Sequence, residues 1–164
     1  MIKKLSVTIC LIISLLIGTS GLNWSADFNK GLVAARSGDY ATALREWTSL
    51  AEQGDATAQI NLGVMYEDGI GIPKDLKIAV KWYKIAAEQG DARAQVNLGL
   101  MYAQGFGVIP DKLYAYMWFN LASSTGDEDA TINKDIIAKQ MTASELSSAQ
   151  KLTLECFRKN YKGC

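Results

Sequence analysis

The sequence contains no histidine, so it lacks the usual general base of serine and cysteine nucleophile systems and the commonest zinc ligand. This absence excludes most hydrolase designs. The three cysteines form no CxxC pair, the spacing typical of thiol redox and structural zinc sites. Basic and acidic residues balance at 17 each, so the composition offers no excess positive charge for nucleic acid. We expect no cofactor and no metal site.

Paired carboxylates and phosphate loops are lacking too. Glu67 and Asp68 are adjacent, so their side chains point about 100° apart on a helix and suit glycoside hydrolysis poorly. We interpret both as solvated charges near a helix end. Gly69-x-Gly71 before Lys74 lacks the longer Walker spacing, and we assign these glycines to a turn.

The N-terminal residues have a composition of their own. Lys3 and Lys4 precede an unbroken weakly polar to apolar run, Leu5–Ile17, and small residues follow at 18–21. Positive charge, apolar run and small residues in this order are the layout of a secretory signal peptide. We therefore predict a signal peptide over residues 1–21.

An uncleaved anchor is the alternative for this segment. Thirteen residues of helix rise only about 20 Å, whereas a bilayer core requires roughly 20 residues. Cys10 follows Ile9 rather than a small residue, so we do not expect lipid attachment there. We expect an exported chain, periplasmic or secreted, with no membrane span once the leader is removed.

Two cysteines remain after such cleavage, Cys156 and Cys164, and disulfides persist in oxidising compartments. Eight helical residues would separate them by about 12 Å, whereas a disulfide requires Cα atoms roughly 4.4 to 6.8 Å apart. A helix must therefore end between them, and Asn160 and Gly163 tolerate the left-handed backbone of such a reversal. We predict a disulfide between Cys156 and Cys164. A redox-active or metal-binding pair is the alternative.

The sequence repeats with a period of 36 residues. At this offset Ala51–Asp55 matches Ala87–Asp91, Leu62-Gly63 matches Leu98-Gly99, Met65-Tyr66 matches Met101-Tyr102, Gly69-x-Gly71 matches Gly105-x-Gly107, Asp75 matches Asp111, and Trp82-Tyr83 matches Trp118-Phe119. So many matches at one offset are not expected by chance. A period of this length indicates stacked supersecondary units.

Each unit has the pattern of two helices. Apolar and small residues recur at helical spacing over 58–66 and again over 76–87. Gly69, Gly71 and Pro73 predict a chain reversal between them, and Asp75 is placed to cap the second helix. Trp82 and its counterpart Trp118 are expected to fill gaps between units. The fold class is therefore all-α, an α-solenoid of antiparallel helix–turn–helix repeats with about three hairpins and a C-terminal capping helix.

The predicted parts after the leader are an N-terminal partial repeat at 22–55, full repeats at 56–90 and 91–126, and C-terminal capping helices with the cysteine pair at 127–164. Thr142-x-x-Glu145 is a capping box that opens the last helix. Terminal repeats need an atypical outer face, because otherwise the end of the stack leaves apolar surface in water.

Each unit contains the string Ala-Glu-Gln-Gly-Asp-Ala-x-Ala-Gln-x-Asn-Leu-Gly-x-Met-Tyr, followed by Gly-x-Gly and by an Asp before Trp-Tyr or Trp-Phe. This pattern resembles the Sel-one-like repeat family, relatives of the tetratricopeptide repeats. The resemblance covers residues 39–124 well. It departs where Pro73 before Lys74-Asp75 becomes Pro110 directly before Asp111, and the repeated cysteines of the family's cysteine-rich branch are missing. The activity of that branch towards β-lactams is therefore not carried over. The resemblance implies an adaptor that presents a concave surface to protein segments.

The first helices of the hairpins line the inner curve in related solenoids, and this places Asn61 and Asn97 at equivalent positions there. A repeated amide can hold the main chain of a ligand. The alternative is that the two amides tie neighbouring helices together. The candidate partner-binding residues are Asn61, Val64, Asp68, Asn97, Leu100 and Gln104.

We predict an exported, non-catalytic interaction scaffold or adaptor for a protein or peptide partner in the cell envelope. Stacking of its ends on another copy stays open. One alternative is a small envelope enzyme or regulator in β-lactam or peptidoglycan chemistry, which requires acidic or Ser/Lys catalysis because histidine is absent. Another is a membrane-tethered assembly factor that keeps the leader as its anchor.

Overall fold

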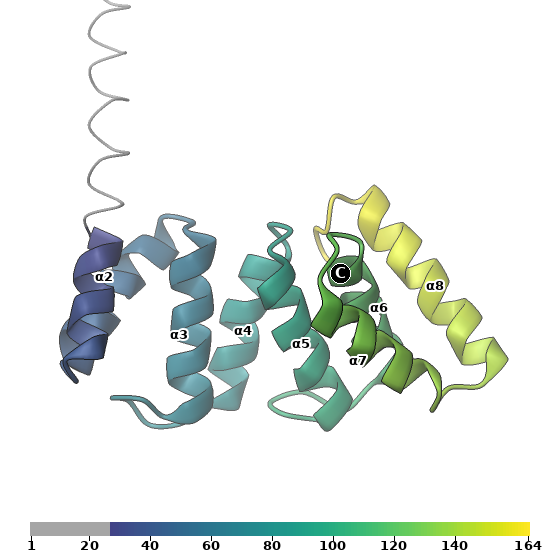
Figure 1. Ribbon diagram of the computed structural model, residues 1–164, viewed down its shortest axis with the longest axis horizontal. Coiled ribbons are helices and arrows are strands. Elements are labelled where there is room, and N and C mark those ends of the chain that lie inside the picture. Colours follow the sequence, from purple (N-terminus) through teal and green to yellow (C-terminus); the bar gives the residue numbers. More distant parts are fainter. Residues whose placement is uncertain (1–26) are drawn as a thin grey trace, which may run out of the picture.

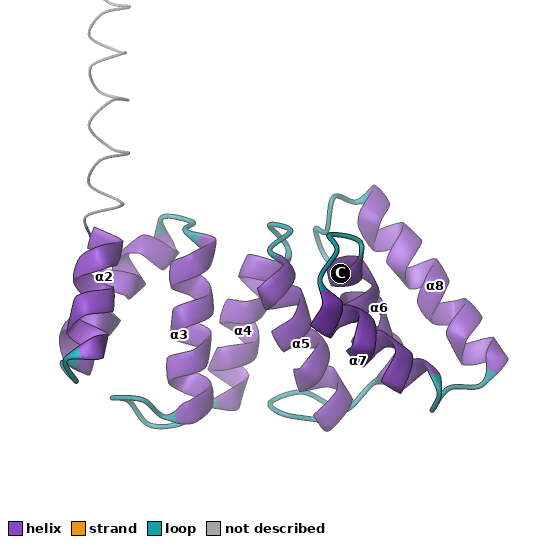
Figure 2. Cartoon of the chain, viewed as in Figure 1, coloured by secondary structure: helices purple, strands orange, loops and turns teal. Residues whose placement is uncertain are grey.

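The computed structural model describes residues 27–164, and the predicted leader with Cys10 lies outside them. The described part is all-helical (Figure 2). A helix over 27–36 comes first, followed by α2 (Tyr40–Glu52), α3 (Ala56–Asp68), α4 (Leu76–Ala87), α5 (Ala92–Gln104), α6 (Lys112–Ser123), α7 (Glu128–Ala138) and α8 (Ala143–Arg158). Within residues 27–164, no helix is both long and apolar enough to cross a bilayer.

The helices stack as antiparallel hairpins along the long axis of the molecule. In Figure 1, α3, α5 and α7 lie in one layer, and the fainter α4 and α6 lie behind it. Within a hairpin α3 packs on α4 and α5 on α6, and between hairpins α2 packs on α3 and α4 on α5. The predicted α-solenoid is confirmed.

An aspartate N-cap begins each helix from α2 to α7. Asp75 accepts hydrogen bonds from the amides of Lys77 and Ile78 at 2.9 and 3.0 Å, as predicted. Its repeat counterpart Asp111 caps α6 in the same way. The capping carboxylates satisfy amides that have no partner inside the helix and lie at the positive end of its dipole. The same residue type therefore marks the start of six successive helices.

A glycine in each of three hairpins receives an aromatic ring from the second helix. A Cβ atom at Gly31, Gly63 or Gly99 would collide with the ring of Trp47, Tyr83 or Phe119, respectively. These contacts recur because a glycine lets the ring approach the backbone of the first helix.

The contact stops at α7, where the residue at the glycine position is the exposed Asp135. Any residue with a Cβ atom at this position excludes the close approach of a ring that the three glycines permit. Accordingly, α8 packs more extensively on α6 than on α7. The end of the array leaves four large apolar side chains at least half exposed. They are Ile132, Ile136, Leu154 and Phe157, so the expected polar outer face is only partly present.

The Tyr83 hydroxyl donates a hydrogen bond of 2.6 Å to Glu67, and the interpretation of Glu67 as a solvated charge was wrong. Burial, followed by the hydrogen bond to Glu67, raises the pKa of Tyr83 far above its usual value. One repeat later, Phe119 and Ala103 replace this pair. Donor and acceptor are therefore either both present or both absent.

This pairing predicts the outcome of a double-mutant cycle. Tyr83→Phe should lower the free energy of unfolding by about 1–3 kcal/mol, because a partly buried carboxylate loses its donor. Adding Glu67→Ala should recover part of that loss, since the pair then matches the one in the next repeat. Urea unfolding followed by circular dichroism measures both values. Equal losses in the single and double variants would contradict the coupling.

The C-terminal residues fold back as a short closed loop. A disulfide joins Cys156 to Cys164, with Cα atoms 5.5 Å apart. Asn160 and Gly163 adopt positive φ angles of 53° and 67°, as predicted, and Tyr161 joins them at 66°. A Cβ atom at Gly90 would lie 3.2 Å from the Tyr161 ring, so this loop packs against the turn between α4 and α5.

Candidate functional site: a repeated face of the odd helices

The six predicted binding residues lie on one stripe of two parallel helices. Three lie on α3 and three at the corresponding positions of α5, with spacings of three and four residues that place them on one helix face. The asparagines, Val64 and Leu100 are partly exposed, and Asp68 and Gln104 are exposed. The structure therefore brings the six together as a surface.

The same stripe continues onto the flanking helices, which the sequence analysis missed. Asn61 and Asn97 each precede by two residues the glycine that contacts an aromatic ring, and Asn29 has the same relation to Gly31. Asn133 has it to Asp135 in α7. The signal was present as the strings Asn-Lys-Gly-Leu, Asn-Leu-Gly-Val, Asn-Leu-Gly-Leu and Asn-Lys-Asp-Ile. The first string does not follow the 36-residue offset, because the turn before α2 is four residues shorter than the corresponding turns before α4 and α6.

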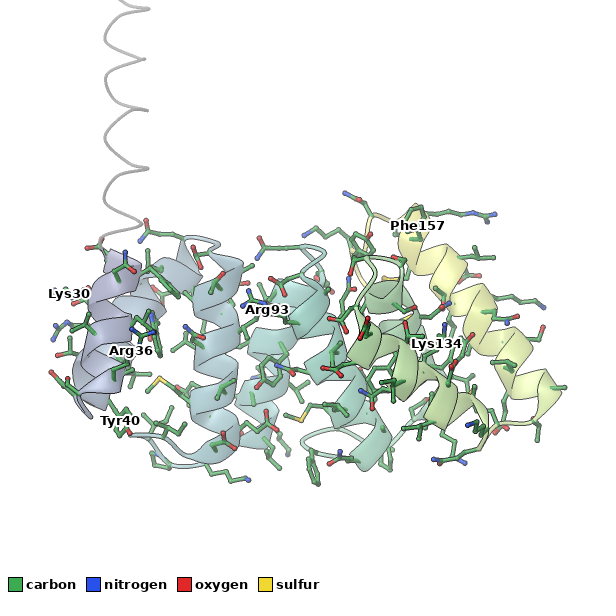
Figure 3. The ribbon with its side chains drawn as sticks, viewed as in Figure 1. Lys30, Arg36, Tyr40, Arg93, Lys134 and Phe157 are labelled. Atoms are coloured by element: carbon green, nitrogen blue, oxygen red, sulfur yellow. A yellow bond between two sulfur atoms is a disulfide. The ribbon has the colours of Figure 1, made fainter. Side chains whose placement is uncertain are left out.

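Two rows of side chains thus follow the stack. We call Asn29, Asn61, Asn97 and Asn133 the Asn row. We call Leu32, Val64, Leu100 and Ile136 the aliphatic row. The surface of helix 27–36, α3, α5 and α7 that carries both rows is the odd-helix face. Figure 3 labels four cations of these helices, Lys30, Arg36, Arg93 and Lys134.

Buried glutamines tie the hairpins together. The Gln59 amide donates to the carbonyl of Ala51 at 3.0 Å, and the Gln95 amide donates to that of Ala87 at 3.3 Å. Both glutamines are 1% exposed. Within residues 27–164 no side chain of the Asn row forms a hydrogen bond with another group, so the helix-tying role proposed as the alternative falls to glutamine. The amides of the Asn row have no partner within the described residues.

An apolar pocket opens beside Asn61, where helix 27–36, α2 and α3 meet. Its volume is about 180 Å³, and it is lined by Ala35, Tyr40, Trp47, Asn61, Val64, Met65 and Ile70. No side chain in this lining carries a charge at neutral pH. A dry cavity of roughly 150 Å³ holds a benzene molecule, so this pocket has room for one aliphatic or aromatic side chain.

A second hollow of about 170 Å³ lies beside Asn97 and is lined by Arg93, Val96, Asn97, Asp127 and Asp129. Arg93 lies 3.2 Å from Asp91 in an ion pair, and Asp127 caps α7 through the amide of Ala130. Arg93 and Asp127 therefore have structural partners. The two hollows differ in polarity although each adjoins an equivalent asparagine.

The shifted pKa values arise at structural contacts away from this face. A hydrogen bond from Lys30 and another from Arg45 lower the pKa of Glu46, and hydrogen bonds from Thr142 lower that of Glu145. Burial raises the pKa of Tyr102. Among the described residues, no three or more His, Cys, Asp or Glu side chains gather as a metal site. What the Asn row and the aliphatic row offer is neutral amides and apolar side chains, which are groups for binding.

The two central repeats match a known repeat family. The family model described as Sel1 repeat matches residues 56–91 and 92–127. The chain contains two Sel1 repeats. Proteins with these repeats are in general non-catalytic scaffolds for protein–protein interaction. No curated protein matches the sequence.

Two solved structures show how far the likeness of this Sel1-repeat chain extends. One is c5321, described as a protective antigen present in uropathogenic Escherichia coli strains and displaying an SLR fold. It is 32% identical, with a TM-score of 0.78, over 84% of this chain and 31% of that one. The other is a Sel1 repeat protein from Oxalobacter formigenes, 32% identical, with a TM-score of 0.62, over 65% of this chain and 44% of that one. The chain spans less than half the length of either protein.

The two matched Sel1 repeats contain the central half of each row, Asn61 with Val64 and Asn97 with Leu100. Asn29 and Asn133 lie outside the matched ranges. Asn133 keeps the 36-residue offset from Asn97, whereas Asn29 lies 32 residues before Asn61 and joins the row through the helix stacking. The odd-helix face is therefore longer than the repeats that define the family.

Proposed function

We propose that this Sel1-repeat protein is an exported, non-catalytic scaffold whose odd-helix face binds a protein or peptide partner in the cell envelope. The observation that carries the proposal is the repetition, on successive odd helices, of an amide that has no partner within residues 27–164 and lies beside an aliphatic side chain. Buried polar groups in a fold are normally paired. The amides of Asn61, Asn97 and Asn133 are partly exposed and that of Asn29 is exposed, so all four can supply donors and acceptors for an external ligand.

Binding is tested by chemical cross-linking and pull-down from envelope extract. The protein expressed from its full coding sequence is compared with an Asn61→Arg, Asn97→Arg double variant and with Gln150→Arg, which places the same charge on the exposed surface of α8. We expect the double variant to lose the partner and the control to keep it, since arginine adds bulk and charge to a row of neutral amides. A partner captured equally by all three proteins would assign binding to another surface.

Export is supported by the charge and apolar pattern of residues 1–21 and by the disulfide geometry of Cys156 and Cys164. We expect protein from the envelope or medium to begin near Leu22 and to weigh two hydrogen atoms less than the thiol form. Intact mass spectrometry with and without reductant measures both. A product that begins at Met1 would instead indicate the membrane-tethered alternative.

A further inference from the structure

The last two helices of the stack carry apolar side chains that no other part of residues 27–164 covers. Ile132 and Ile136 lie one turn apart on α7, and Leu154 and Phe157 lie one turn apart on α8, so each pair occupies one helix face. All four are 50% to 60% exposed. In Figure 1 the two helices diverge from the turn that joins them. We call these four side chains the end patch.

The earlier repeats show what covers such a surface inside the stack. Ile132 holds the position that Val96 holds one repeat earlier and Ile60 two repeats earlier. Ile60 is 6% exposed and lies in a core cluster with Ala94 of the following hairpin. Val96 packs against a cluster that contains Ile137, which also belongs to the hairpin after its own. Ile132 therefore occupies a position that the following hairpin covers in the earlier repeats.

The opposite end of the stack offers no matching surface among the described residues. Lys30 of helix 27–36 holds the position of the buried Leu62 and Leu98, one residue before the glycine that contacts an aromatic ring. Its ammonium group lies 2.7 Å from the Glu46 carboxylate in an ion pair. Val33 is the most exposed large apolar side chain of that helix. Stacking of the C-terminal end on the N-terminal end of another copy is therefore disfavoured.

The charges of α7 and α8 are complementary. On α7, Glu128, Asp129 and Asp135 are exposed and Lys134 is the single basic residue. Residues 143–164 carry four basic and two acidic side chains, which are Lys151, Arg158, Lys159, Lys162, Glu145 and Glu155. Within residues 27–164 none of these charged groups belongs to an ion pair. The α7 helix of one molecule is therefore attracted to α8 of another, and two-fold symmetry makes this contact twice.

We propose that the end patch is the interface of a symmetric dimer, in which α7 of each molecule packs on α8 of a second copy. The two isoleucines of one copy then contact Leu154 and Phe157 of the other, and the acidic side chains of α7 face the basic ones of α8. Such an interface is self-complementary and closed, so assembly stops at two copies. This inference goes beyond the proposed function and does not depend on it, although Ile136 is also the last residue of the aliphatic row.

Sedimentation velocity of the protein expressed from its full coding sequence, loaded at about 1 μM to about 1 mM, tests for the dimer. We expect a reversible dimer whose dissociation constant rises at least tenfold in Ile132→Arg and in Leu154→Arg. Val33→Arg, the matched change at the other end of the stack, should leave the constant unchanged. Each variant is first checked for an unaltered circular dichroism spectrum. A monomer at every concentration, an assembly larger than a dimer, or equal effects of all three substitutions would overturn the proposal.

Charge-reversal variants, checked in the same way, test which helices meet. The Asp129→Lys, Asp135→Lys variant makes α7 basic, and the Lys151→Glu, Arg158→Glu variant makes α8 and the loop after it acidic. We expect each variant alone to dimerise at least tenfold more weakly, because both of its contacts then pair like charges. An equimolar mixture should recover the dimer, since α7 of each variant meets an α8 of opposite charge. Unweakened dimers of the separate variants, or a mixture that recovers nothing, would contradict the pairing of α7 with α8.

Discussion

Replacing Trp118 by alanine is expected to lower the free energy of unfolding by about 3–5 kcal/mol, the usual cost of truncating a buried tryptophan. Trp118 is 1% exposed and belongs to the largest core cluster, which also contains Tyr83, Leu98 and Cys156. Its removal would leave a cavity where several helices meet. Urea unfolding monitored by circular dichroism at 222 nm gives the value.

Two variants serve as controls for this truncation. Trp82 holds the equivalent position one repeat earlier but is only partly buried, so Trp82→Ala should cost distinctly less. Trp118→Phe keeps most of the buried area, and the indole N–H that it removes has no partner within the described residues. Its cost should be well below that of alanine. Equal losses at Trp82 and Trp118 would contradict the difference in burial.

Gly99→Ala is expected to destabilise the protein by about 1–3 kcal/mol, although alanine is the better helix former. Alanine gains about 0.5–1 kcal/mol over glycine in a helix interior. Against this, the new Cβ atom would lie 2.6 Å from the ring of Phe119, itself 2% exposed. Overpacking a dense core costs roughly 1–3 kcal/mol, so the collision outweighs the propensity. Thermal and urea unfolding both measure the net effect.

A smaller partner should rescue this substitution. In the Gly99→Ala, Phe119→Leu variant the ring is gone, and part of the lost stability should return. Ser147→Ala, on the exposed surface of α8, controls for helix propensity and should have little effect. If the Gly99→Ala protein is as stable as the unmodified chain, the ring of Phe119 has room to move. The ring contact would then not explain why the glycine recurs.

The sequence was sufficient for features that depend on neighbouring residues. The period of 36 predicted the stacked hairpins, because each unit must cover the apolar side of the next. The N-caps at Asp75 and Asp111 and the capping box at Thr142 were readable because a cap requires only residues within one turn. The turn between Cys156 and Cys164 followed from the short loop between them.

Contacts between helices were not readable in the same way. Glu67 was interpreted as solvated because its donor, the Tyr83 hydroxyl, comes from the next helix. Buried Gln59 and Gln95 had no assigned role, although they recur at the repeat offset, since their acceptors are carbonyls of the preceding hairpin. A side chain's partner in another helix depends on the angle and depth of packing, which local patterns do not contain.

The sequence by itself determined the repeat, its helical hairpins and the residue types that begin and end each helix, because these depend on local hydrogen bonding and on the period of apolar side chains. Only the tertiary structure showed that the Asn row extends from two helices to four. A shorter turn before α2 and an aspartate at the glycine position of α7 break the sequence period at both ends. Helix packing restores the alignment there, because each odd helix must still bury its apolar side against the even helix beside it.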